Sequence, residues 1–147
     1  MTIDQGLFAR ASRQLRRDEG AVSHAYADSE GYLTIGVGRL VDKRKGGRLR
    51  DDEMEYLLRN DIEETAAALR DRLPWFTGLD EARQGVLLNM AFNLGVSGLL
   101  GFRQTLALVE RGDYQKAAEE MLNSKWARQV GSRANRLAEQ METGRWQ

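Results

Sequence analysis

The sequence contains no cysteine, one proline and one histidine among its 147 residues. Without cysteine there is no disulfide framework, no thiolate metal ligand and no thiol nucleophile. The scarcity of proline, together with 41% hydrophobic and 30% charged residues, argues against extended disorder and favours a helix-rich globule. At this length we expect a single domain, residues 1–147, that is held together by packing alone.

Net charge and long hydrophobic runs are also missing. The 22 basic and 22 acidic side chains cancel, so no overall field draws the chain to nucleic acid or to an anionic surface. No apolar run approaches the roughly 20 residues of a membrane span, and residues 1–6 lack the features of a signal peptide. We therefore expect no membrane insertion and no secretion signal.

One basic cluster stands out, Lys43-Arg44-Lys45 with Arg48 and Arg50. The acidic residues that follow it at 51–53 offset its charge, and no aromatic residues are interleaved to stack on bases. A solvated loop is the favoured interpretation, and a nucleic-acid partner is not expected.

Hydrophobic periodicity changes along the first half of the chain. Apolar residues at three- and four-residue spacing predict an amphipathic helix from Thr2, a candidate cap, to Asp18. Strand-forming residues around a turn then predict a β-hairpin over residues 25–38. A long helix is predicted from about residue 51 to a point before Pro74, with a length that suits a connector between two lobes.

The second half of the chain has the pattern of a helical core. A segment that is apolar on most sides, residues 82–94, predicts a buried central helix that Gly95 ends in a left-handed conformation. Shorter helices are predicted at 104–110, from an Asp113 cap to Leu122, and from a Ser132 cap to about Met141.

Several other features indicate structure rather than chemistry. Gly36-Val37-Gly38 lacks the third glycine and the βαβ unit of a dinucleotide-binding loop. His24 has no partner residues at metal-ligand spacing, so we expect it on the surface and expect no metal or cofactor. The three tryptophans could stack on sugars, but we expect them in the core: Trp75, Trp126 and Trp146.

Two acidic residues near the junction of helix and hairpin suggest glycosidase chemistry, which needs an acid for the leaving oxygen and a second carboxylate. Glu19 ends a helix, where an anion opposes the dipole and where the protonated form of a general acid is favoured. Asp28 opens a turn, a position that often has only a structural role. Thr34 is an ordinary strand residue by itself, and it is the joint arrangement of the three that indicates a site.

The surrounding residues resemble the catalytic segment of the phage lysozymes typified by the T-even bacteriophage enzyme. The pattern is Glu, eight residues, Asp, five residues, Thr, within a glycine-rich hairpin. The resemblance covers nearly the whole chain, through these segments: Arg17–Gly20, Tyr26–Leu40, Leu79-Asp80, Leu88–Gly95, Gly101-Phe102, Ala117-Ala118, Ser124–Trp126, Arg133–Arg136 and Thr143–Trp146.

The resemblance implies a role for each matched position. Glu19 is similar to the general acid of the family, and Asp28 to the residue that positions or deprotonates the attacking water. Thr34 is similar to the residue that assists that water. Arg133 matches the arginine that pairs with the catalytic glutamate, which would favour its ionised form and offset the dipole. Three further residues fall where the family lines its saccharide cleft, although each could equally pack the core: Leu40, Phe92 and Thr105.

This chain also departs from the family pattern. Arg39 replaces a frequent histidine, and an Arg39–Asp61 ion pair could replace a His–Asp pair. Glu120 replaces a polar, amide-bearing cleft residue, which makes a direct saccharide contact there doubtful. The segment between Leu40 and Leu49 is shorter than in the T-even enzyme, so the small lobe is expected to be trimmed. Zero net charge predicts weaker salt-dependent attraction to anionic walls than in basic relatives.

The expected fold is α+β and lysozyme-like, mostly helical, with a β-containing lobe at roughly 12–60. The helical lobe is expected to comprise residues 61–147 and the N-terminal helix 1–11. The resemblance implies a monomeric peptidoglycan hydrolase that cleaves between N-acetylmuramic acid and N-acetylglucosamine with inversion. It also implies residence in the host bacterial cytoplasm until holin-dependent release to the wall.

Three alternatives stay open at this stage. One is a catalytically inactive peptidoglycan-binding module, against which the intact acids argue. Another is a glycosidase that acts on chitin or chitosan. The last is a helical nucleic-acid binder built on the basic cluster, which the lack of net positive charge disfavours.

Overall fold

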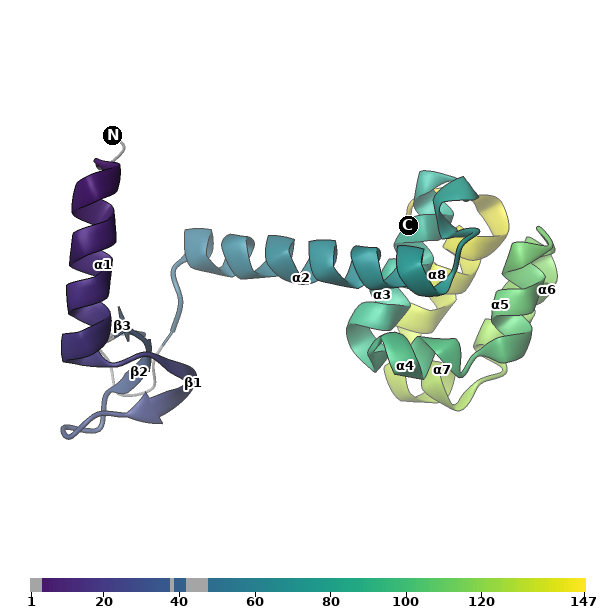
Figure 1. The fold of residues 1–147 in the computed structure, drawn as a ribbon. Helices are drawn as coiled ribbons and strands as arrows, with labels where there is room; N and C mark the ends of the chain where they lie inside the picture. The colour runs from purple at the N-terminus through teal and green to yellow at the C-terminus, as the bar shows by residue number, and fades with distance from the viewer. Residues whose placement is uncertain (1–3, 38, 42–47) are drawn as a thin grey trace. The chain divides into compact units, whose positions relative to one another are not determined.

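The computed structural model describes residues 4–37, 39–41 and 48–147 and divides the chain into two compact units, 1–56 and 57–147. Figure 1 shows a mostly helical chain with one small antiparallel sheet, which confirms the predicted α+β class. The division of the chain into a lobe at 12–60 and a lobe at 61–147 with 1–11 stays a prediction.

The first unit begins with helix α1, Gln5–Glu19. Its end agrees with the predicted helix, while the proposed cap Thr2 lies outside the described residues. Gly20 follows with φ 78°, a conformation that residues with a Cβ rarely adopt, and its N–H donates to the carbonyl of Arg16 at 3.0 Å. Glycine therefore ends the helix immediately after Glu19.

Three antiparallel strands follow in the order β1-β2-β3: β1 (Val22–Ala27), β2 (Leu33–Gly36) and β3 (Arg39–Leu40). The predicted hairpin is confirmed by β1 and β2, whereas β3 was not predicted as a separate strand. It is only two residues long, too short for a period-2 pattern to be visible in the sequence. Gly38 and the basic residues Lys43-Arg44-Lys45 lie outside the described residues, as does most of the shortened segment after Leu40.

Helix α2, Asp51–Arg72, begins where the sequence predicted. Three acidic residues occupy its first turn, where they face the positive end of the helix dipole, and Arg70 and Arg72 occupy the last. The Glu53 carboxylate also accepts the N–H of Arg50 at 2.8 Å, as in one half of a capping box. At 1.5 Å per residue the helix is about 33 Å long.

The second unit contains the core. Its central helix is α3, Glu81–Leu94, which Asp80 caps by accepting the Arg83 N–H at 3.1 Å. Gly95 ends α3 with φ 78° and ψ 157°, so the φ is positive as expected but the residue is not in the left-handed helical region. A short 3-10 turn precedes α3 at Phe76–Gly78.

Five more helices complete this unit: α4 (Val96–Leu100), α5 (Arg103–Glu110), α6 (Tyr114–Leu122), α7 (Lys125–Val130) and α8 (Ser132–Thr143). The helices α4 and α7 were not predicted, because five or six residues give too little periodicity. Asp113 takes the predicted N-cap position of α6, although its side chain makes no cap hydrogen bond. The Ser132 cap was wrong, because Ser132 is the first residue of α8 and Gly131 takes the cap position.

Buried apolar side chains from α3, α4, α5, α6, α7 and α8 form the core, and Leu69 joins it from the end of α2. Trp126 is 3% exposed and Trp75 packs partly buried against the core, as predicted. Trp146 is 61% exposed, so its assignment to the core was wrong. It lies in the chain after α8, where fewer elements are available to cover it. No helix of the described chain is long and apolar enough to cross a membrane.

Candidate active site

Glu19 is the last residue of α1 and is exposed. Arg16 and Arg17 occupy the same last turn, where their charges complement the negative end of the helix dipole. Arg17 donates to its neighbour Asp18 at 3.0 Å. No described residue of the first unit binds the Glu19 carboxylate, so within this unit the carboxylate is accessible to solvent.

Asp28 follows β1 directly and is held by its own turn. Its Oδ1 accepts the N–H of Glu30 at 2.9 Å and that of Tyr32 at 2.8 Å. Its backbone N–H donates to the Tyr32 carbonyl at 2.8 Å, and the Gly31 N–H returns to the Asp28 carbonyl at 3.0 Å. These bonds fix one carboxylate oxygen. Among the described residues none donates to the other, Oδ2, so it can accept a proton or a hydrogen bond from water.

Thr34 lies at the centre of the sheet and is 7% exposed. It is opposite Tyr26 of β1 and opposite Leu40 of β3. Its hydroxyl Oγ1 donates to the Tyr32 carbonyl at 3.3 Å, which leaves the lone pairs of Oγ1 as acceptors. The structure thus brings Asp28, Thr34 and Leu40 together in one small sheet, with Leu40 38% exposed at its edge strand.

The strand β1 separates Glu19 from Asp28 in sequence, and it is irregular. Val22 is opposite Gly36 and Tyr26 is opposite Thr34, so four steps along β1 match two steps along β2. Such a bulge bends the strand that carries the extra residues. A regular strand of this length would place its ends about 17 Å apart, whereas a bent strand brings its ends closer together.

In the second unit, Phe92 and Arg133 line one groove of about 260 Å³ with Leu58, Ile62 and Trp146. Phe92 is 45% exposed there. The Arg133 guanidinium donates twice to Oδ1 of Asn89, at 2.9 and 2.7 Å. This side chain is therefore oriented by α3 at the groove.

Thr105 is not part of that groove. It is 4% exposed on α5 and lines a separate pocket of about 500 Å³ with Phe102, Arg103 and Glu120. The structure therefore brings Phe92 and Arg133 together and places Thr105 in another hollow. Glu120 borders this second hollow with its partly buried side chain.

Two partners of these residues were missed by sequence reasoning. Asn89 lies three residues before Phe92, on the same face of α3, and that spacing is the signal that could have drawn attention to it. Glu53 was also missed, although Arg39 forms its ion pair with Glu53 and not with the suggested Asp61. Glu53 and Asp61 both lie on α2, and Arg39 pairs with Glu53, which is nearer the start of the helix.

Glu53 links the sheet to the start of α2 electrostatically. The N–H of Arg50 that Glu53 accepts, together with the charges of Arg39 and Arg50, lowers the pKa of this carboxyl below its usual 4.5. A hydrogen bond from the Arg50 side chain likewise lowers the pKa of Asp52. In the described part of the chain no group of three or more acidic or imidazole side chains could hold a metal ion.

A family model described as "Phage lysozyme" matches residues 16–142, which is most of the chain. The chain belongs to the phage lysozyme family. That membership supports a lysozyme-type peptidoglycan hydrolase, and the matched range includes both Glu19 and Asp28.

Relatives of this phage lysozyme occur in quite different organisms. "Probable T4-type lysozyme 1" of Dictyostelium discoideum is 31% identical over 156 residues, covering 88% of this chain and 92% of the relative. "Endolysin" of Salmonella phage P22 is 32% identical over 116 residues, covering 74% and 76%. "Pre-baseplate central spike protein Gp5" of Enterobacteria phage T4 is 29% identical over 158 residues, covering 90% of this chain but 28% of that protein.

Proposed function

We propose that this phage lysozyme is an N-acetylmuramidase that cleaves the β-1,4 bond between N-acetylmuramic acid and N-acetylglucosamine in peptidoglycan. The observation that carries the proposal is the pair Glu19 and Asp28 at the two ends of a bulged strand. Family membership supplies the substrate class.

The proposed reaction inverts the anomeric centre. Glu19 donates its proton to the glycosidic oxygen as the bond from that oxygen to the anomeric carbon breaks. A water molecule attacks the same carbon from the opposite face and gives its proton to Asp28. This mechanism requires the two carboxyl groups to be about 6.5–9.5 Å apart, to leave room for the water.

The structure around Asp28 and Thr34 suits the activation of water. Oδ1 of Asp28 is committed to two backbone N–H groups, so the carboxylate holds one orientation while Oδ2 faces the water. The Thr34 hydroxyl donates to a carbonyl and accepts a hydrogen bond from the same water. Thr34 is therefore proposed as the group that orients the nucleophile for Asp28.

The remaining predicted residues are proposed to bind the saccharide chain. Leu40, Phe92, Thr105 and Arg133 would provide contacts along the glycan. The Asn89 side chain supports this role of Arg133 because it holds the guanidinium in a defined orientation. The protein is proposed to act as a monomer on peptidoglycan after holin-dependent release from the host cytoplasm.

The test is the Glu19→Gln variant, assayed on outer-membrane-permeabilised bacteria. Loss of general acid catalysis predicts a fall in clearing rate of about 100-fold to 10 000-fold, with the melting temperature unchanged or raised. Glu30→Gln is the matched control. Glu30 is an exposed acid in the turn that follows β1, and it contacts Asp28 through its backbone N–H and not through its side chain. Full activity of Glu19→Gln would overturn the assignment of the acid.

Analysis of the released fragments decides between this proposal and the alternatives. A new N-acetylmuramic acid reducing end, first formed as the α anomer, supports an inverting muramidase. An N-acetylglucosamine reducing end indicates another glycosidase, and binding without release of fragments indicates an inactive peptidoglycan-binding module.

A further inference from the structure

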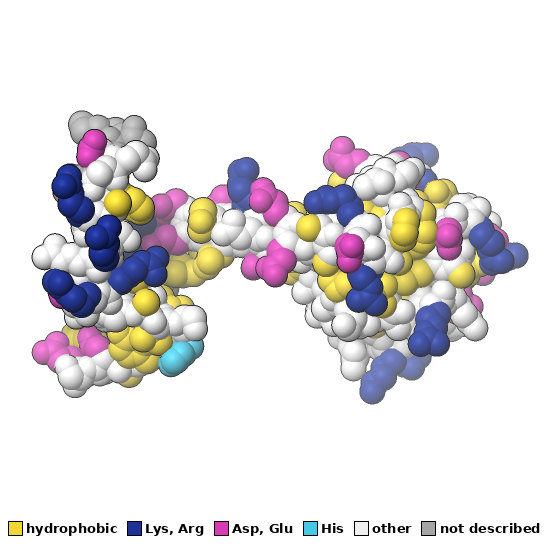
Figure 2. All heavy atoms as spheres, viewed as in Figure 1, with side chains coloured by type: hydrophobic (Ala, Val, Ile, Leu, Met, Phe, Trp, Pro, Cys, Tyr) yellow, Lys and Arg dark blue, Asp and Glu magenta, His cyan; other side chains and the backbone are white. Residues whose placement is uncertain are grey.

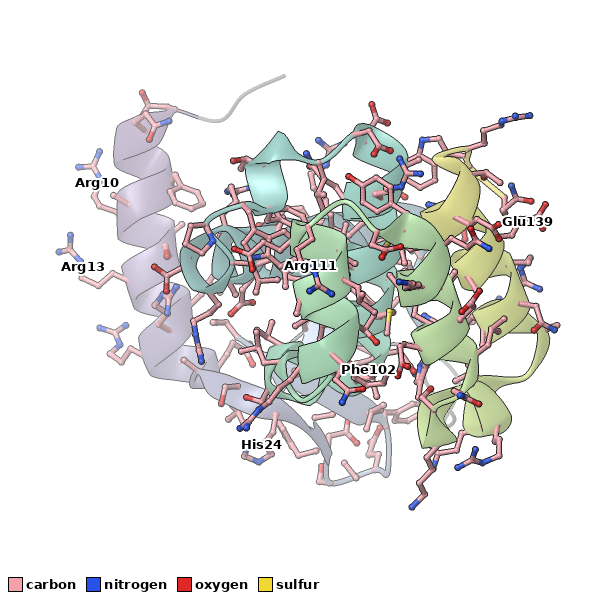
Figure 3. All side chains as sticks on the ribbon, turned by 90° about the vertical axis from the view of Figure 1, so that its right-hand side faces the viewer. Arg10, Arg13, His24, Phe102, Arg111 and Glu139 are labelled. Carbon is pink, nitrogen blue, oxygen red and sulfur yellow. The ribbon has the colours of Figure 1, made fainter. Side chains whose placement is uncertain are left out.

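Four arginines and no lysine lie in α1, at positions 10, 13, 16 and 17. At about 100° per residue these positions fall within roughly one third of the helix circumference. All four side chains are exposed, and Figure 2 shows basic side chains following the length of α1. In Figure 3, Arg10 and Arg13 project to the same side of the helix. We call these four residues the arginine stripe.

Among the described residues, ion pairs balance only part of the positive charge of the stripe. Arg17 pairs with Asp18, but no described residue forms an ion pair with the other three arginines. Burying three unpaired guanidinium groups would carry a large desolvation penalty. The stripe therefore faces solvent or an anionic partner.

The chemistry of the stripe fits a polymer of phosphodiesters. A guanidinium presents a planar fork that fits the two unesterified oxygens of a phosphodiester, a geometry that an ammonium group lacks. From Arg10 to Arg17 the helix rises about 10.5 Å, so the cations form a row that a linear polyanion can follow.

Two other anionic partners fit less well. Phe8 and Leu15, two large hydrophobic residues of α1 that are exposed, lie on the side away from the stripe. No described aromatic ring of α1 is therefore interleaved with the arginines to stack on nucleic-acid bases. On the same helical spacing Asp18 and Glu19 fall on this apolar side as well. Carboxylates on the face that would insert disfavour docking on an anionic lipid surface.

We propose that the arginine stripe of α1 binds a phosphodiester-linked glycopolymer of the bacterial envelope and so retains the enzyme on the wall. The inference rests on the proposed function, because it presumes that the wall is where the enzyme acts. Since the net charge of the chain is zero, the attraction is local and acts within about one Debye length, about 8 Å at physiological salt.

The test uses the full chain and poly(glycerol phosphate) as the probe, with binding measured across a salt series. Arg10, Arg13 and Arg16 are replaced together by glutamine, which has nearly the same helix propensity as arginine. The matched control replaces Arg70, Arg111 and Arg128 by glutamine, three exposed arginines of the second unit, so both variants lose three positive charges.

The stripe variant is expected to lose at least ten-fold in affinity at about 0.1 M salt, and the control less than two-fold. Each phosphate contact to a single-stranded polyanion contributes about 0.7 to the slope of log affinity against log salt. The stripe variant should therefore lower that slope by about 2. Equal losses in both variants, or no loss in the stripe variant, would overturn the proposal.

Two further measurements separate the other outcomes. Poly(glycerol phosphate) should protect Arg10, Arg13 and Arg16 of the unmodified protein from phenylglyoxal and should leave Arg111 reactive, and protection of neither group contradicts the proposal. Tighter binding to phosphatidylglycerol vesicles, to single-stranded DNA or to polyglutamate would replace the glycopolymer with a membrane, nucleic-acid or carboxylate partner.

Hydrolysis is measured in parallel on walls stripped of phosphate polymers. The stripe variant should release reducing ends from these walls at the rate of the unmodified enzyme. If the unmodified enzyme released none, the proposed function would fail, whatever the binding result. The two proposals therefore fail separately.

Discussion

The side chain of Arg83 offers a stability prediction whose size can be worked out from its contacts. Its Nε donates to the Met141 carbonyl at 2.7 Å and a terminal nitrogen donates to the Glu142 carbonyl at 2.8 Å. A second terminal nitrogen lies 3.0 Å from Asp80, and the guanidinium carbon lies 3.6 Å from the centre of the Tyr114 ring. One residue of α3 thus binds the carbonyls at the end of α8.

Two hydrogen bonds from a charged donor contribute about 1.5 kcal/mol each at the lower end of their range. The contact with the ring adds about 0.5–1 kcal/mol. Freeing the arginine rotamers in Arg83→Ala returns up to about 2 kcal/mol of side-chain entropy. The net loss in free energy of unfolding is therefore about 2 kcal/mol, equivalent to a melting temperature lower by about 4–8 °C for a chain of this size.

The assay is urea-induced unfolding followed by far-ultraviolet circular dichroism, with Arg83→Lys and Arg111→Ala as companions. Lysine keeps the positive charge but lacks the planar, forked donors of the guanidinium, so Arg83→Lys should lose at least about half as much free energy of unfolding as Arg83→Ala. Arg111 is exposed and is labelled in Figure 3, and its truncation should change the free energy by less than about 0.5 kcal/mol. A loss in Arg83→Ala as small as that of the control, or full restoration by lysine, would refute the reasoning.

Two other contacts give predictions of the same kind. The indole N–H of Trp126 donates to Oδ1 of Asn93 at 2.9 Å, so Asn93→Ala leaves it without that acceptor and should destabilise the protein by about 1–2 kcal/mol. Asn93→Asp, which keeps the acceptor, should cost less, and equal losses in urea unfolding would contradict this. Glu53 has a lowered pKa in the folded protein, so the stability it contributes is present above about pH 4.5 and is lost as the pH falls through the lowered value. Between about pH 6 and about pH 3 the urea midpoint should therefore fall more steeply for the unmodified protein than for Glu53→Gln, and parallel curves would argue against a role for the pair with Arg39.

Helix ends were predicted best from the sequence where a single residue determines the local backbone conformation. Gly20 is needed for a positive φ, so the end of α1 at Glu19 could be placed without knowledge of the fold. The first turn of α2 was equally accessible, because its acidic residues mark a helix start. Cap hydrogen bonds were less predictable. Asp113 takes the predicted cap position of α6, but its carboxylate lies 3.6 Å from Lys116 and makes no cap hydrogen bond. Gly131, and not Ser132, takes the cap position before α8.

Features that depend on distant residues were not predictable. Trp126 and Trp146 have the same chemistry, yet Trp126 packs edge-on against Phe102 at 6.2 Å while Trp146 follows the last helix and stays exposed. The choice of Glu53 over Asp61 as the partner of Arg39 depends on where β3 meets the start of α2, and β3 itself was missed. Amino-acid type gives no information about these choices until the elements are assembled.

The same distinction divides the candidate site. Glu19, Asp28 and Thr34 lie within sixteen residues, and the turn, the bulge and the glycine that position them are all local. The orientation of Arg133 depends on Asn89, 44 residues earlier in the chain, and no short-range pattern connects them. The residues proposed for the chemistry can therefore be read from one local helix and hairpin, whereas a group that orients a distant partner becomes visible only once the whole helical unit is assembled.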